Sequence, residues 1–229
     1  MGKKWITKNG YIIQQVLDSN NPLLVSNKTT SILIDTGSRK KWMKLSDKIN
    51  CILSNKLKLS AVILTHTHHD HVQNARSFKD TFKLDIIVHK SEAEYLKDGG
   101  SIYITSNNEK YIKNYEPVMW DIQTDDKYDL CNYDLDAYIL HTPGHSTGSV
   151  SIIIDNEIAI VGDALSGLDN KPFKRTLKKV SEDIKSSWDK LLNLKCLLYL
   201  PAHRSHRYQA LEYKDFNELY RSYLTSIKS

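Results

Sequence analysis

Four histidines and one aspartate fall within six positions in the first half of the chain, at residues 66–71. The surrounding segment, residues 65–72, reads Thr-His-Thr-His-His-Asp-His-Val. Neutral imidazole and carboxylate are ligands that suit zinc and non-haem iron or manganese. Because Asp70 directly precedes His71, one short loop can supply ligands to two metal ions. The alternative is a histidine-rich surface tract that chelates metal by accident.

A rigid element must hold these histidines in place. They follow the apolar run Ala61-Val62-Ile63-Leu64, which predicts a buried strand that ends in a loop. Three more predicted strands, over residues 135–140, 158–161 and 196–200, are also followed by ligand-type residues. These residues are His145 after the turn Pro143-Gly144, Asp163 after Gly162, and His203 after Pro201-Ala202. Loops at strand ends commonly carry functional residues on a rigid scaffold, so the added ligands favour a metal site over accidental chelation.

The remaining pattern predicts two series of strands and helices, one on either side of about residue 117. We expect further strands at residues 11–17, 23–26, 31–35, 85–88, 128–131 and 150–154, and helices at residues 40–53, 72–82, 92–96, 173–194 and 208–227. Residues 99–117 show no steady period, and we expect a loop with helical pieces that leans over the active site. Two sheets packed face to face with helices outside fit this order. No linker divides the chain, so residues 1–229 are expected to form one domain.

The composition indicates a globular protein. Hydrophobic residues make up 40% of the chain, enough for a sizeable core, and the lysines are scattered at a net charge of only +5, so no nucleic-acid partner is expected. No run approaches the ~20 apolar residues of a membrane span, and no apolar run follows the basic start of the chain, so no secretory signal is expected. We expect Cys51, Cys131 and Cys196 to be buried in a reducing compartment, and the protein to be cytoplasmic.

The order and spacing of the ligand motifs resemble the metallo-β-lactamase-fold hydrolase superfamily over roughly residues 11–206, with the glyoxalase II and lactonase-like branch the most similar. The motifs are His66-x-His68-x-Asp70-His71, Thr142-Pro143-Gly144-His145, Gly162-Asp163 and a late Pro-x-His203. The resemblance implies an α+β fold, a four-layer αββα sandwich with a dinuclear metal site along one sheet edge. It assigns His66, His68 and His145 to one metal, Asp70, His71 and His203 to the other, and Asp163 to both. In this pattern His69 is not a ligand.

The same resemblance implies a metal-dependent hydrolase with two divalent ions, zinc in the first place and iron or manganese as alternatives. A metal-bound hydroxide is expected to attack a small ester, thioester or lactone, and Asp70 to orient it and take up a proton. A histidine at position 68 favours hydrolysis, because similar di-iron redox proteins carry glutamate there. A mononuclear iron persulfide dioxygenase, a phosphodiester-cleaving member of the fold and a non-catalytic metal-binding module stay open as alternatives.

Fewer residues indicate how substrate is recognised. Arg204 and His206 follow the last candidate ligand, and they either contact substrate or are ordinary surface residues. Residues 164–179 contain five basic residues, which form either a basic flap for a carboxylate or phosphate or a solvated helix start. Asp35, at the end of a predicted strand, either braces the histidine loop or is an ordinary turn residue.

Overall fold

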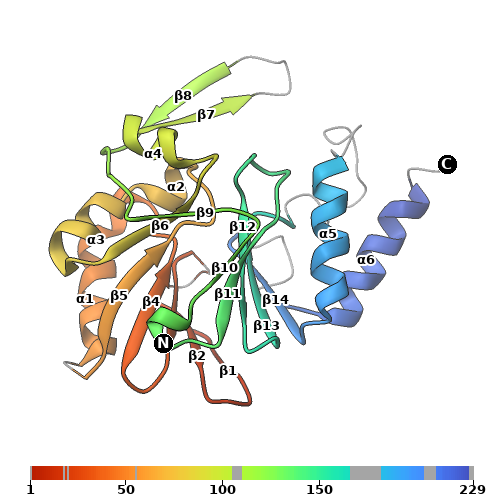
Figure 1. Ribbon diagram of the computed structural model, residues 1–229, viewed down its shortest axis with the longest axis horizontal. Helices are drawn as coiled ribbons and strands as arrows, with labels where there is room; N and C mark the ends of the chain where they lie inside the picture. The colour runs from red at the N-terminus through yellow and green to blue at the C-terminus, as the bar shows by residue number, and fades with distance from the viewer. Residues whose placement is uncertain are drawn as a thin grey trace.

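Two β-sheets pack face to face, and helices cover the outer side of each sheet (Figure 1). The computed structural model describes residues 2–17, 19, 21–54, 56–104, 110–165, 182–203 and 210–226. Within them the order of layers is helix, sheet, sheet, helix, which is clearest where the sheets are seen edge-on in Figure 1. The α+β four-layer sandwich expected from the sequence is therefore confirmed.

The first sheet has seven strands in the spatial order β1-β2-β3-β4-β5-β6-β9. Their bounds are β1 (Lys4–Ile6), β2 (Ile12–Gln15), β3 (Leu23–Ser26), β4 (Thr30–Ile34), β5 (Lys58–Ile63), β6 (Asp85–His89) and β9 (Ile122–Thr124). Strands β1 to β4 pair antiparallel, whereas β4, β5, β6 and β9 run parallel. Because parallel strands end at the same edge, the segments that follow β4, β5 and β6 emerge side by side there.

The second sheet has six strands in the spatial order β10-β11-β12-β13-β14-β15. Their bounds are β10 (Lys127–Asp129), β11 (Ala137–His141), β12 (Val150–Ile154), β13 (Ile158–Gly162), β14 (Leu198–Pro201) and β15 (Leu211–Glu212). All neighbours pair antiparallel except β13 and β14, which are parallel. Strand β11 is antiparallel to β12 and therefore parallel to β13 and β14. The segments that follow β11, β13 and β14 thus leave the sheet at one edge.

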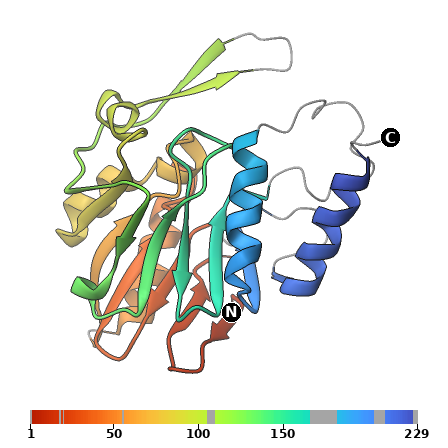
Figure 2. The same cartoon turned by 45° about the vertical axis from the view of Figure 1, so that its right-hand side comes forward.

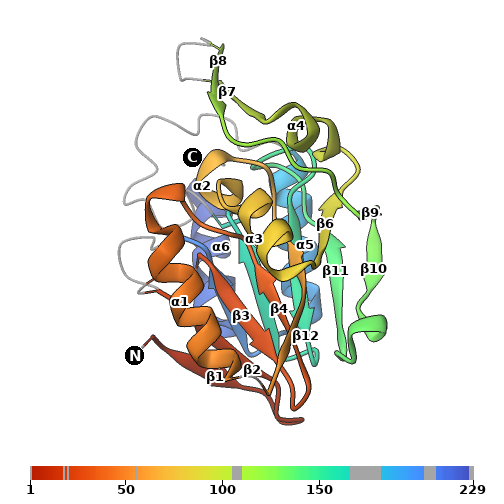
Figure 3. The ribbon, with the colours of Figure 1, turned by 90° about the vertical axis from the view of Figure 1, so that its left-hand side faces the viewer.

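The helices fall into two groups, one for each sheet (Figure 3). On the first sheet lie α1 (Trp42–Leu53), α3 (Ala75–Phe82) and α4 (Ala93–Asp98), and on the second lie α5 (Glu182–Leu194) and α6 (Tyr213–Ser226). The short helix α2 (His69–Val72) and two 3-10 turns, η1 (Arg39–Lys41) and η2 (Cys131–Tyr133), complete the set. None of the described helices has the length and apolarity required to span a lipid bilayer.

Three layers of apolar side chains hold the sandwich together. In β3, Leu24 packs toward the helices of the first sheet, whereas Leu23 and Val25 point between the two sheets. In β12, Ile153 packs toward α5 and α6, and the isoleucines on either side of it point between the sheets. Successive side chains of a strand point to opposite faces, so strands buried on both faces need continuous apolar runs. The core between the sheets fixes the two loop-bearing edges relative to each other.

Several sequence-based expectations were wrong. Residues 211–212 form β15, although a helix was expected over residues 208–227. Residues 99–117 contain a β-hairpin of β7 (Gly100–Ile104) and β8 (Lys110–Asn114), which extends away from the sandwich beside α4 (Figure 2). The helix expected over residues 72–82 is divided into α2, which begins at His69, and α3. Cys196 is buried, but Cys51 and Cys131 are exposed. Cys51 follows the buried Ile49 by two positions, ~200° around α1, and therefore faces solvent.

Candidate metal centre

Asp35, which follows β4, braces the loop that carries the clustered histidines. Its buried carboxylate accepts hydrogen bonds from the amide and the hydroxyl of Thr65, both at 2.8 Å, and lies 2.8 Å from Nδ1 of His71. When the His71 ring is neutral, Nδ1 donates to Asp35 and Nε2 keeps its lone pair for a metal. Of the two roles considered for Asp35, the structure therefore shows the bracing one.

The end of β4 also anchors helix α2. The amide and the hydroxyl of Thr36 both donate to the carbonyl of His71, at 2.7 and 2.8 Å. His68 lies just before the helix in an extended conformation, with φ −63° and ψ 143°. The change from extended to helical backbone at this point brings His68, Asp70 and His71 to the same edge of the first sheet.

Two glycine turns bring residues of the second sheet to this edge. Gly162 has φ +50°, and a Cβ on it would lie 2.8 Å from Cβ of Thr65, so the end of β13 packs directly against the histidine loop. The amide of Val150 donates to the carbonyl of Thr65 at 2.9 Å. Gly144 has φ +131°, and a Cβ there would overlap Ile184 at 2.2 Å, so the turn before His145 packs tightly on α5. Close packing at Gly162 and Gly144 thus places Asp163 and His145 beside the histidine loop.

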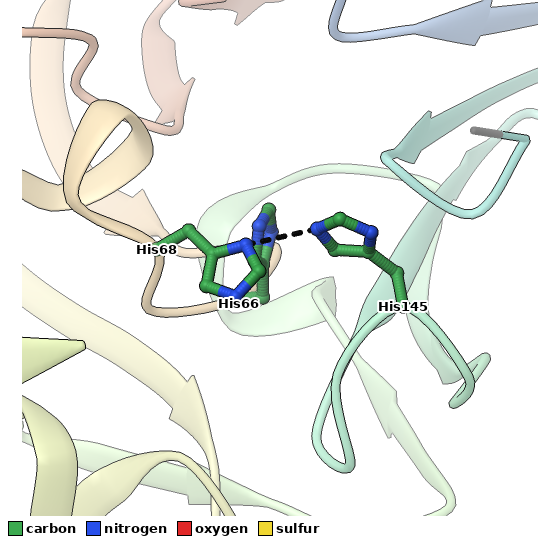
Figure 4. Close-up of side chains that lie close together, drawn as sticks. All are labelled: His66, His68 and His145. Carbon is green, nitrogen blue, oxygen red and sulfur yellow. Dashed lines mark hydrogen bonds between the residues drawn. The ribbon is translucent and has the colours of Figure 1, made fainter. Parts of the chain in front are cut away.

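All seven candidate ligands lie in one cluster, although they come from four separate loops. Ligand-type atoms lie within 4.8 Å of one another in three overlapping groups: His66, His68 and His145; His66, His71 and Asp163; and Asp70, His71 and His203. In the first group, Nε2 of His145 is 2.9 Å from Nδ1 of His68, and His66 lies close to both (Figure 4). In the last group, Nε2 of His203 is 3.2 Å from Oδ2 of Asp70.

Asp163 lies between the first and the last of these groups. Its Oδ2 is 3.4 Å from Nε2 of His145, 3.7 Å from Nε2 of His71 and 3.6 Å from Nε2 of His203. One carboxylate oxygen therefore faces nitrogen atoms of both groups. This is the position that a carboxylate needs in order to bridge two cations.

The donor set fits divalent transition metals. Metal–nitrogen and metal–oxygen bonds of about 2.0–2.2 Å place two tetrahedral ligand atoms roughly 3.3–3.6 Å apart. The close pairs in the cluster lie between 2.9 and 3.7 Å apart. Nε2 of His66 and Oδ1 of Asp163 are buried and have no hydrogen-bond partner among the described residues. Because buried polar atoms are normally partnered, these two atoms indicate ligand positions.

Three of the histidines are electrically neutral at pH 7. Burial lowers the pKa of His66 and of His145 and brings the pKa of His68 to about 4. The nearby imidazoles lower the pKa of His66 and His68 further. A neutral imidazole is the form that binds metal, so the first group needs no deprotonation before it can hold a cation.

The second group is charged instead. Burial opposes the cationic form of His71, but the Asp35 carboxylate outweighs it and raises the pKa of His71 to about 9. Burial likewise opposes ionisation of Asp70, yet the hydrogen bond from His203 and the positive charge of His71 hold its pKa below the usual range. The same hydrogen bond raises the pKa of His203. A cation that binds here at neutral pH must displace a proton from His71.

Glu92 is a buried residue of the site that the sequence pattern does not indicate. Its Oε2 accepts hydrogen bonds from the amide of Thr67 at 3.0 Å and from the Thr67 hydroxyl, and its Oε1 accepts from the amide of Gly148 at 3.0 Å. Glu92 thereby joins the loop of His66 and His68 to the loop of His145. Its partners lie 25 and 56 positions away in the chain, so no local spacing reveals the role.

The cluster opens into a cleft of about 710 Å³, which we call the main cleft. His68, Asp70, His145, Asp163 and His203 line it together with Glu92, Tyr95 and neighbouring residues. Such a volume suits a small-molecule substrate. His69 lies at its wall, belongs to none of the three ligand groups and has Nε2 3.4 Å from Nζ of Lys113. The substrate contacts expected at Arg204 and His206, and the basic residues expected in a flap, lie outside the described residues.

The fold and the cluster together define a class of metal-dependent hydrolase. Residues 16–203 match the sequence profile of the Metallo-beta-lactamase superfamily, and the chain therefore belongs to that superfamily. The chain is similar to a probable metallo-hydrolase of Methanocaldococcus jannaschii, with 28% identity over 64% of this chain and 67% of that protein. A probable metallo-hydrolase of Streptococcus pyogenes is 28% identical over 83% of this chain and 78% of that protein.

Solved structures share the fold at low sequence identity. A metallo-beta-lactamase with a HARLDQ motif from Cronobacter sakazakii superposes with a TM-score of 0.67 at 14% identity, over 99% of this chain and 95% of that one. A beta-lactamase from Chitinophaga pinensis superposes with a TM-score of 0.67 at 18% identity, over 95% and 91% of the two chains. The superfamily, the fold and the metal-dependent hydrolase class expected from the motifs are confirmed.

Proposed function

We propose that this protein uses two divalent cations to hydrolyse a small ester, thioester or lactone. The position of Asp163 Oδ2 between two groups of ligand-type residues carries the proposal. His66, His68 and His145 hold one cation, Asp70, His71 and His203 hold the other, and Asp163 binds both. Zinc is the proposed metal, because the set contains five histidines, two aspartates and no cysteine.

The residues around the cations have separate tasks. When bound, two such ions lower the pKa of a water molecule and polarise the carbonyl of the substrate. Asp35 holds the ring of His71 through Nδ1, and Glu92 holds the two ligand-bearing loops together. Oδ2 of Asp70 faces His203, and Oδ1 lies 3.4 Å from Nδ1 of His69. We assign to this Oδ1 the orientation of the attacking water and the uptake of its proton.

Metal analysis combined with an activity panel tests the proposal. Purified protein should hold two zinc ions per chain, should cleave at least one class among aryl esters, thioesters and lactones, and should lose that activity in chelator and regain it with zinc. Asp163→Asn should bind zinc more weakly at both positions, because it removes the shared negative charge. Full activity without bound metal contradicts the proposal. One iron per chain with oxygen uptake on glutathione persulfide identifies a dioxygenase instead, and phosphodiester cleavage alone assigns a different substrate class.

A further inference from the structure

We infer that the substrate carries an anionic group, a carboxylate or a phosphate, which binds beside Lys41 in a second cavity next to the metal centre. This inference rests on the proposed function and names the substrate class of the same site.

The second cavity has a volume of about 270 Å³. Leu17 and Leu45 line its apolar part, and Asn21, Ser38 and Lys41 line its polar part. Asp70 and His203 line both this cavity and the main cleft, so the metal centre lies where the two spaces meet. Complete ligand pockets are typically about 300–1,000 Å³. The small cavity therefore suits one end of a substrate whose larger part lies in the main cleft.

The wall of this cavity carries the positive charge of Lys41, which forms no salt bridge within the described residues. Lys41 is the last of three consecutive cations, Arg39, Lys40 and Lys41, which form η1. Within the described part of the chain, no salt bridge joins any of the three to an acidic group. Asp70 is the one carboxylate among the described residues that line the cavity, and its Oδ2 is already engaged by His203. An entering anion would complement the charge of Lys41.

Two polar side chains can hold the same end of the substrate. Within the described residues the side chain of Ser38 makes no capping hydrogen bond, so its hydroxyl can donate to an anion. Nδ2 of Asn21 donates to the carbonyl of Asp70 at 3.2 Å, whereas its Oδ1 is buried without a partner among the described residues. Such an acceptor requires a donor. A hydroxyl or amide N–H near the anionic group of the substrate would satisfy it.

Matched substrates test the inference on the zinc-loaded full chain. One pair consists of aryl esters with a five-carbon acyl chain that ends in a methyl group or in a carboxylate. A second pair places the carboxylate on the alcohol side, and a third replaces it with a phosphonate. The ratio of KM values, neutral over anionic, measures the preference for charge within each pair. We expect a preference of about fivefold in at least one pair, which weakens at high salt; the pair that shows it distinguishes carboxylate from phosphate chemistry.

Variants distinguish the effect of Lys41 on the preference for anionic substrates from the effect of the general surface charge. Lys41→Ala should abolish the preference, Lys41→Glu should reverse it and Lys41→Arg should retain it. Lys44→Ala is the matched control, because Lys44 is an exposed lysine of α1 that does not line the cavity, and it should leave the preference unchanged. A wild-type protein without preference, or a preference that persists in Lys41→Ala, overturns the inference while hydrolysis of neutral esters still supports the proposed function.

A direct binding measurement covers the case in which no ester is cleaved. Calorimetry of glutarate and of inorganic phosphate with the wild type and Lys41→Ala then decides between two results. Binding that is weakened about fivefold by Lys41→Ala keeps the anion site although the proposed function fails. Equal or absent binding in both proteins overturns the anion site as well.

Discussion

Nδ1 of His71 lies 2.8 Å from Oδ2 of Asp35, and both side chains are almost completely buried. The pair fixes the orientation of the imidazole, so that Nε2 points to Asp163 and His203. It also keeps both ring nitrogens protonated in the metal-free protein. Burial opposes this cationic form, but the Asp35 carboxylate outweighs burial and raises the pKa of His71 to about 9. A cation that binds Nε2 at neutral pH must therefore displace the proton on Nε2.

Zinc affinity should consequently rise with pH. Between pH 7 and pH 9 we expect about a tenfold increase per pH unit for each displaced proton, measured by competition with a chelating dye. In Asp35→Asn the pKa of His71 falls toward its ordinary value. The pH range over which zinc affinity rises steeply therefore moves to lower pH. The same variant should lower the affinity by about 10–100-fold, because the ring loses its brace. An affinity that stays constant between pH 7 and pH 9 contradicts this coupling.

The stability of the metal-free protein should be greatest near neutral pH. Below pH 6.5 the unfolded chain takes up protons on histidines that the fold keeps neutral, such as His68 with its pKa of about 4, so the free energy of unfolding falls toward acid. The raised pKa of His71 stabilises the fold below pH 6.5, and this contribution is lost as the pH rises through 9. Urea unfolding in chelator at pH 5, 7 and 9 should therefore show the highest midpoint at pH 7, and a midpoint at pH 5 equal to that at pH 7 would show that the acid-side prediction is wrong.

Replacement of Glu92 should disturb both loops that it joins. Glu92→Gln puts an amide group among three donors, so at least one buried donor loses its acceptor, and we expect a loss of about 1–3 kcal/mol in the free energy of unfolding. Zinc should bind more weakly as well, because His68 and His145 are no longer held at a fixed distance. Denaturant unfolding and dye competition measure the two effects.

Glu94, in the first turn of the helix that Glu92 precedes, provides the matched control. It is exposed and pairs with Lys97 at 3.4 Å, so Glu94→Gln should change the free energy of unfolding by less than about 0.5 kcal/mol. Equal effects of the two substitutions would show that Glu92 has no special role in joining the loops.

The contact between Gly162 and Thr65 predicts a second sensitive position. In Gly162→Ala the added Cβ would lie 2.8 Å from Cβ of Thr65 at a φ of +50°, so the end of β13 must move away together with Asp163. We expect a loss of about 2 kcal/mol in stability and a clear loss of zinc affinity. Gly10→Ala is a control that introduces backbone strain without steric overlap, because Gly10 has φ +85° with nothing within 4 Å of the added atom. This control should lose some stability but no zinc affinity, and a loss of affinity there would count against the explanation.

Much of the fold and the cluster could be predicted because both depend on continuous apolar strands that end at polar loops. The strand at residues 23–26 agrees with β3, and the segments before His66, Asp163 and His203 are strands as expected. Strands β1, β9 and β15 contain only two or three residues, too few for a recognisable alternation. The hairpin of β7 and β8 lies outside the sandwich, so the apolar pattern of the two packed sheets does not extend to it.

The contacts that support the cluster could not be predicted in the same way. Glu92 binds Thr67 and Gly148 through the fold, and nothing in its neighbourhood along the chain distinguishes it from Glu94. Asp35 could be placed at a strand end, but its bond to His71 depends on the parallel register of β4 and β5. The metal-ligand residues can therefore be predicted from the sequence. The residues that hold them in place cannot, because their contacts depend on the register of the sheets.

The proposed assignment gives each cation ligands from both sheets, since His66 and His68 combine with His145, and Asp70 and His71 combine with His203. Bound ions would consequently act as staples across the seam of the sandwich. A substitution deep in the core between the sheets, far from any substrate, would then lower the zinc affinity first. The abundance of such a variant in a cell would follow the zinc content of the growth medium, and trace metal would mask damage that a metal-depleted culture reveals.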